Sequence, residues 1–67
     1  MKESERFAKQ YNVTVEEASA ELAQIAKELR ASQRKAEKAT DGKYRGFTAE
    51  YLAQNAARYE RYAAGEE

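Results

Sequence analysis

One stretch of the chain, residues 15 to 39, carries apolar and small side chains at alternating steps of three and four residues. These positions are Val15, Ala18, Leu22, Ile25, Leu29, Ser32, Ala36 and Ala39. Side chains at this spacing fall on one face of an α-helix, as the a and d positions of a heptad repeat do. The spacing therefore predicts one long amphipathic helix with a continuous seam.

The residues at both ends of this stretch suit helix termini. Thr14 can act as N-cap, because its hydroxyl can accept from the backbone N–H of Glu17 while the Glu17 carboxylate returns to the Thr14 amide in a capping box. Lys38 lies near the other end, where positive charge suits the helix dipole. Gly42 can adopt the left-handed conformation that closes a helix. We therefore expect this helix to span about residues 15 to 40.

A further helix is expected after the long one, over about residues 49 to 64. Thr48 is a good N-cap for it, and Phe47 before the cap is expected to pack on Leu52 as a hydrophobic staple. The segment between the two helices, DGKYRG, contains two of the three glycines of the chain and is expected to be a loop.

A short first helix is expected over about residues 3 to 11. It presents Phe7 and Tyr11 on one face, and Asn12 tolerates the left-handed turn that follows. The chain has no Pro and only three Gly, which favours helices throughout, and no strand is expected. The predicted fold class is all-α: a single helical domain over residues 1–67 with a short helix, a long central heptad helix and a third helix.

The core that such a chain can bury is thin. It has fourteen alanines, whereas Leu, Ile, Val and Phe together number eight, and it has no Cys and no His. Small domains with thin cores usually need disulfides, metals or oligomerisation. We therefore expect a helical homodimer with its long helices packed together and its short helices along opposite halves of each long one. The alternative is a chain that folds only on its partner. The candidate dimer seam comprises Leu22, Ile25, Leu29, Leu52 and Tyr59.

The order of elements, short helix, long helix, loop and third helix, is also that of the histone fold. The segment VTVEEA resembles the start of a histone's long helix, and DGKYRGFTAEYLA is similar to the loop and the start of the final helix in archaeal histones. The resemblance implies a histone-like dimer as the alternative fold. The net charge of zero departs from the DNA-wrapping surface of that family.

Positive charge gathers in residues 30 to 45, where six cations face two acids, a local balance of plus four in a chain of zero net charge. On the long helix, cations at steps of three, four and four form a stripe on the side away from the seam. Tyr44 is placed to stack on an exposed base, and an acidic protein is an equal candidate partner. The alternative is an ordinary solvated helix end. The candidate binding surface comprises Lys27, Arg30, Arg34, Lys38, Lys43, Tyr44 and Arg45.

An enzyme is not expected. Without His or Cys, the commonest general base and the strongest nucleophile are absent. Glu16, Glu17 and Glu21 suit the dipole of a helix N-terminus. No Gly-rich phosphate loop is present and no cofactor is predicted. Without Cys and His, no metal site is predicted either.

These observations favour a non-enzymatic small helical protein that binds or regulates another protein, as an inhibitor, adaptor or assembly factor acting through its helix faces. The alternative is a small nucleic-acid-binding protein that uses the basic stripe and the following loop. The segment MKESERFAKQ has no apolar run of signal-peptide or membrane length, so a cytoplasmic location without membrane contact is expected.

Overall fold

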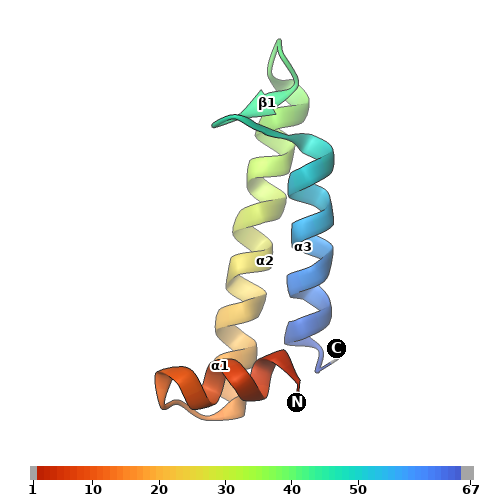
Figure 1. Cartoon of the computed structure of the whole chain (residues 1–67). Helices are drawn as coiled ribbons and strands as arrows, with labels where there is room; N and C mark the ends of the chain where they lie inside the picture. The colour runs from red at the N-terminus through yellow and green to blue at the C-terminus, as the bar shows by residue number, and fades with distance from the viewer. Residues whose placement is uncertain (1, 66–67) are drawn as a thin grey trace.

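The structure, a computed structural model, describes residues 2 to 65 and contains three helices and one short hairpin (Figure 1). The elements in chain order are α1 (Glu3–Tyr11), α2 (Val15–Lys38), β1 (Lys43–Tyr44), β2 (Phe47–Thr48) and α3 (Ala49–Ala63). The predicted short helix, long central helix and third helix are confirmed. Within the described part of the chain, no helix has both the length and the apolar character needed to cross a membrane.

The helices form an elongated body of 41 × 18 × 15 Å. Helix α3 runs antiparallel to α2 and contacts α2 along most of the length of α3, while α1 crosses the N-terminal end of α2 (Figure 1). The prediction that the two short helices lie along opposite halves of α2 is wrong. The hairpin reverses the chain at the end of α2, so α3 returns along α2 until it contacts α1.

Side-chain caps start the two longer helices as the sequence predicts. The backbone N–H of Glu17 donates to Thr14 Oγ1 at 3.1 Å, and that of Tyr51 donates to Thr48 Oγ1 at 3.1 Å. In the first cap, the Glu17 carboxylate accepts from the Thr14 hydroxyl at 3.1 Å rather than from the Thr14 amide. Each threonine satisfies a backbone donor that the helix itself leaves unpaired.

The ends of the helices differ slightly from prediction. Helix α1 ends at Tyr11 as predicted, and its C-cap Asn12 is left-handed with φ 55° as expected. Helix α2 ends at Lys38 rather than residue 40, because Ala39 is extended. Gly42 is left-handed with φ 70°, but it lies in the following turn, where its N–H donates to the Ala39 carbonyl. Helix α3 ends at Ala63, one residue early.

The connection between α2 and α3 is a two-residue β-hairpin, which corrects the prediction of no strand. Lys43 pairs with Thr48 and Tyr44 with Phe47 in antiparallel register. Between them, Arg45 has φ 54° and the following glycine, Gly46, has φ 85°. Positive φ at both central residues is the requirement of a type I′ turn, whose twist suits a tight hairpin. Two-residue strands are too short for periodicity to reveal.

The core of residues 2 to 65 is built mainly from alanine. Ala18, Ala36 and Ala56 are completely buried, and Leu22 and Leu52 are the two large apolar side chains that are buried. On α1 the buried side chains are Ser4 and Ala8, whereas Phe7 is half-buried and Tyr11 is exposed. The small side chains let α3 approach α2 closely, and larger apolar side chains are left at the edges of the interface.

Candidate interaction surfaces

One ion pair marks one side of the α2–α3 pair. Arg30 Nε donates to Glu60 Oε2 at 3.0 Å and Arg30 Nη2 donates to Glu60 Oε1 at 2.8 Å, while Nη1 donates to Gln33 Oε1 at 3.0 Å. The hydrogen bond from Arg30 holds the pKa of the Glu60 carboxyl below its ordinary value, and the same bond raises the pKa of Arg30. Arg30 therefore joins α2 to α3 instead of pointing freely outward.

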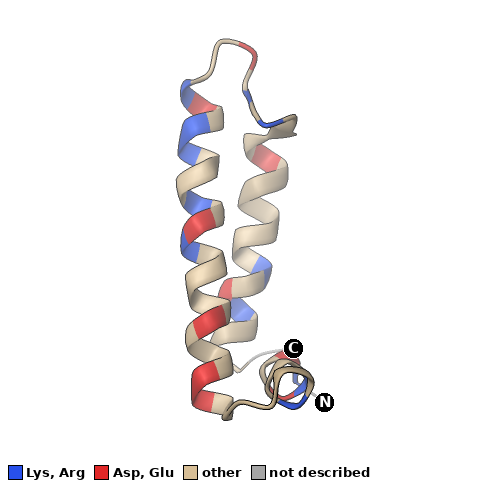
Figure 2. Cartoon of the chain, turned by 90° about the vertical axis from the view of Figure 1, so that its left-hand side faces the viewer, with Lys and Arg blue, Asp and Glu red and all other residues tan. Residues whose placement is uncertain are grey.

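The predicted basic stripe is present, but Arg30 is partly withdrawn from it. Lys27, Arg34 and Lys38 are exposed on α2, whereas Arg30 is half-buried against α3. Figure 2 shows that positive charge gathers on the C-terminal half of α2 and negative charge on its N-terminal end. Three of the four cations of the stripe are thus exposed.

Two cations form a cluster with the Tyr44 ring: Arg45 of the hairpin turn and Lys35 of α2. Lys35 Nζ lies 5.1 Å from the centre of the Tyr44 ring, and Arg45 Cζ lies 5.5 Å from it. Both distances are within the range of cation–π attraction. Tyr44 is half-buried, while Lys43 and Arg45 are exposed. The ring predicted to receive a base is already in contact with cations of its own chain.

The opposite side of the α2–α3 pair carries apolar side chains. At about 100° per residue, Ile25 lies about 140° round α2 from Arg30, and Tyr51 lies about 180° round α3 from Glu60. Because Arg30 and Glu60 meet on one side, Ile25 and Tyr51 lie on the other. We call this surface the aromatic face, and its members are Ile25, Leu29, Phe47, Tyr51, Tyr59 and Tyr62.

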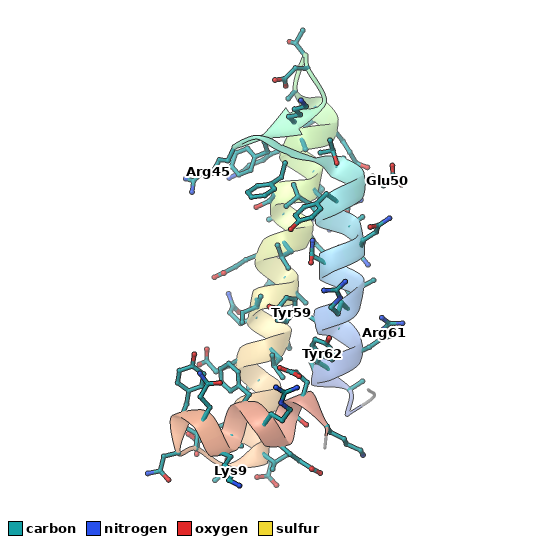
Figure 3. The ribbon with its side chains drawn as sticks, in the orientation of Figure 1. Lys9, Arg45, Glu50, Tyr59, Arg61 and Tyr62 are labelled. Atoms are coloured by element: carbon teal, nitrogen blue, oxygen red, sulfur yellow. The ribbon has the colours of Figure 1, made fainter. Side chains whose placement is uncertain are left out.

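The aromatic face is only partly covered by the protein itself. Phe47 and Tyr51 are 48% and 51% exposed, and their rings stack with centroids 5.2 Å apart. Tyr59 and Tyr62 are half-buried and meet edge to face at 5.7 Å; Figure 3 shows them on the viewer's side of α2 and α3. Phe47 thus packs on Tyr51, and its staple with Leu52 stays a prediction.

The residues of the candidate dimer seam divide into two groups. Leu22 is 1% exposed and Leu52 is 5% exposed, so both lie in the core of a single protomer. Ile25, Leu29 and Tyr59 are half-buried and belong to the aromatic face. A strict heptad seam does not distinguish these groups, because a straight helix drifts away from a 3.5-residue repeat.

A hollow of about 280 Å³ lies between α1 and the first turns of α2. Its apolar lining comes from Phe7, Tyr11 and Val13, and its charged lining from Glu17 and Glu21. The Phe7 and Tyr11 rings are 4.6 Å apart and tilted by 43°. We call this site the acidic hollow. Its lining comes from three segments of the chain, so sequence spacing did not reveal it.

In the range 2–65, no three His, Cys, Asp or Glu side chains gather as metal ligands would. Comparison of the chain with protein-family models, with curated proteins and with solved structures finds no match. Three surfaces are candidates for function: the basic stripe with the Tyr44 cluster, the aromatic face and the acidic hollow.

Proposed function

We propose that the protein is a non-enzymatic, protein-binding homodimer that works as a regulator, inhibitor or assembly factor, and that two copies associate through the aromatic face. The observation that carries this proposal is the exposure of Phe47 and Tyr51 beside half-buried Ile25, Leu29 and Tyr59 on one side of the molecule. Contiguous apolar patches of this kind are typical of interaction sites, and Tyr is favoured there because it joins a large apolar body to a polar tip.

The thin core favours a second copy as the occupant of this face. Two leucines and five alanines make up the buried apolar side chains of residues 2 to 65. A domain of this size buries a smaller fraction of its surface than a larger domain does, and small domains commonly gain stability by oligomerisation. Pairing two aromatic faces about a two-fold axis would bury the exposed large apolar side chains of that face, Phe47 and Tyr51, in both copies.

In such a dimer the basic stripe stays available for another molecule. Lys27, Arg34 and Lys38 lie on the side of α2 that carries Arg30, away from the aromatic face. We propose an acidic protein as the partner of this stripe, because surface charge steers association with an oppositely charged partner.

Sedimentation equilibrium tests the dimer. We expect a species of twice the 7.6 kDa chain mass at micromolar concentration. Tyr51→Lys should shift the equilibrium to monomer, because it places a charge in the centre of the apolar contact. Ala23→Lys, at an exposed position about 160° round α2 from Ile25 and therefore outside the face, is the matched control and should remain dimeric. A wild-type chain that stays at 7.6 kDa throughout the micromolar range would refute the proposal.

A nucleic-acid-binding function is the second candidate. The cations Lys35 and Arg45 beside the aromatic ring of Tyr44 favour it, since phosphates and bases need these two kinds of contact. Lys38 and Lys43 add exposed positive charge to the same part of the chain. The withdrawal of Arg30 by Glu60 and the net charge of zero count against it. The histone-like dimer also stays a proposal, supported by the order of the helices.

An electrophoretic shift separates the two functions. Binding by phosphate neutralisation should weaken steeply between about 50 and 200 mM salt and should be lost when Arg34, Lys38 and Lys43 are changed together to Glu. Absence of any shift at low salt with single- or double-stranded DNA or RNA would remove the second candidate.

A further inference from the structure

We propose that the acidic hollow of one protomer receives the Arg45 side chain of a second copy, in an antiparallel two-fold dimer. This inference rests on the homodimer of the proposed function and adds to it a specific site, in which the second copy supplies the missing cation. The aromatic face alone does not determine how the two copies are oriented, whereas this contact does.

The chemistry of the hollow suits a guanidinium group. The carboxylates of Glu17 and Glu21 stand one helical turn apart on α2 beside the rings of Phe7 and Tyr11. Carboxylates offer charged acceptors to a guanidinium, and ring faces attract it through cation–π contact. Among residues 2 to 65, neither glutamate has a Lys or Arg nitrogen within 4.0 Å. The hollow therefore combines negative charge and aromatic surface without a cation.

The hairpin presents a matching cation. Arg45 occupies the first central position of the turn with φ 54°. This conformation is unfavourable for most residues other than Gly, Asn and Asp. Its side chain is exposed and projects away from the helices in Figure 3. Within the described residues, no carboxylate lies within 4.0 Å of its guanidinium. The turn thus holds in solvent a guanidinium that lies beside the Tyr44 ring but has no carboxylate partner among the described residues.

The hollow and the hairpin lie on the same flank of α2 but at opposite ends. Lys35 lies beside Tyr44, the residue next to Arg45, and marks the position of the hairpin on α2. Lys35 follows Glu21 by fourteen residues, or nearly four full turns, so the two side chains lie within about 40° of each other round the helix. The separation along the axis is about 21 Å, too far for Arg45 to reach the hollow of its own chain. In Figure 1, the C-terminal end of α1 and the tip of the hairpin extend to the same side of α2.

In an antiparallel dimer, each protomer can place its hairpin at the acidic hollow of the other. A two-fold axis perpendicular to α2 near its middle places the hairpin of each protomer at the hollow of the other, so two identical contacts form. Figure 2 shows that α2 is acidic at its N-terminal end and basic in its C-terminal half. The antiparallel arrangement therefore places the acidic end of each α2 beside the basic end of the other. A parallel pair would place like charges together at both ends, which is unfavourable.

Charge reversal tests the contact. Glu21→Arg and Arg45→Glu are each expected to raise the dimer dissociation constant at least about tenfold, because each homodimer then contains two like-charge contacts. An equimolar mixture of the two variants should form a heterodimer with nearly wild-type affinity, since both contacts are then complementary. Sedimentation equilibrium measures the affinities, native mass spectrometry identifies the heterodimer, and circular dichroism checks that each variant remains helical.

Matched controls separate this contact from the general effect of charge. Glu16→Arg makes the same change about 140° round α2 from Glu21, and Arg34→Glu makes the opposite change away from the hairpin. Both should dimerise like the wild type. A dimer that is unaffected by the Glu21 and Arg45 variants, or a mixture that forms no heterodimer, overturns the inference and leaves the proposed homodimer standing. A wild-type monomer overturns both.

Discussion

Arg30 and Glu60, thirty residues apart in the chain, form a two-pronged ion pair that ties α2 to α3 with nitrogen–oxygen distances of 3.0 and 2.8 Å. Both side chains remain partly exposed, at 36% and 49%. An exposed pair of this kind adds little to stability, but its bidentate geometry favours one register between the two helices. It also separates the charged side of the α2–α3 pair from the aromatic face.

This pair predicts a specific pH dependence of stability. The folded-state pKa of Glu60 lies below its ordinary value of 4.5, chiefly because of the hydrogen bond from Arg30. The stabilisation is therefore present above pH 4.5 and is lost as the pH falls through the lower folded value. Arg30→Gln should abolish it, so urea unfolding of the variant should depend less on pH in this acidic range than unfolding of the wild type. Arg34→Gln should keep the wild-type dependence, and identical curves for all three proteins would contradict the assignment.

The helices could be predicted because their signals are local. Thr14 and Thr48 start α2 and α3 where their caps indicate, and the 3–4 spacing identifies α2. The partner of Arg30 could not be predicted, since Glu60 lies on another helix and its position depends on how the hairpin turns the chain back. The acidic hollow was missed for the same reason: Tyr11 and Glu21 meet only when α1 crosses α2.

The N-cap of α2 should contribute measurably to stability. Thr14→Ala removes the hydroxyl that accepts from the Glu17 N–H, so we expect the free energy of unfolding to fall by about 1 kcal/mol. Thr14→Ser keeps the acceptor and should restore most of this loss. Thr40→Ala, in the exposed turn after α2, is the control and should change stability little. Chemical denaturation followed by circular dichroism measures all three, and equal effects at residues 14 and 40 would contradict the role of the cap.

The close approach of α2 and α3 should not tolerate a larger side chain. Ala36 is 0% exposed, so Ala36→Leu must push the helices apart or distort the side chains around it, at a cost of roughly 1–3 kcal/mol. Ala23→Leu makes the same change at an exposed position of the same helix and should be nearly neutral. Thermal unfolding compares the two variants. If Ala36→Leu proved as stable as Ala23→Leu, the alanine interface described above would be incorrect.

In the hairpin turn, a substitution of Arg45 should have opposite effects on the stability of the monomer and on the affinity of the dimer. Arg45→Asn relieves a left-handed conformation that Asn tolerates better, so the free energy of unfolding measured on the monomer should rise by up to about 1 kcal/mol. The same change removes the guanidinium that the acidic hollow is proposed to bind, so the dimer should weaken. Gly46→Ala keeps Arg45 but strains a residue with φ 85°, and it should lower stability by roughly 1–2 kcal/mol. Because no atom crowds the position of the added methyl group, that loss would report backbone strain alone. An Arg45→Asn variant that is less stable as a monomer would show that the side chain, through its contact with Tyr44, outweighs the strain of the turn.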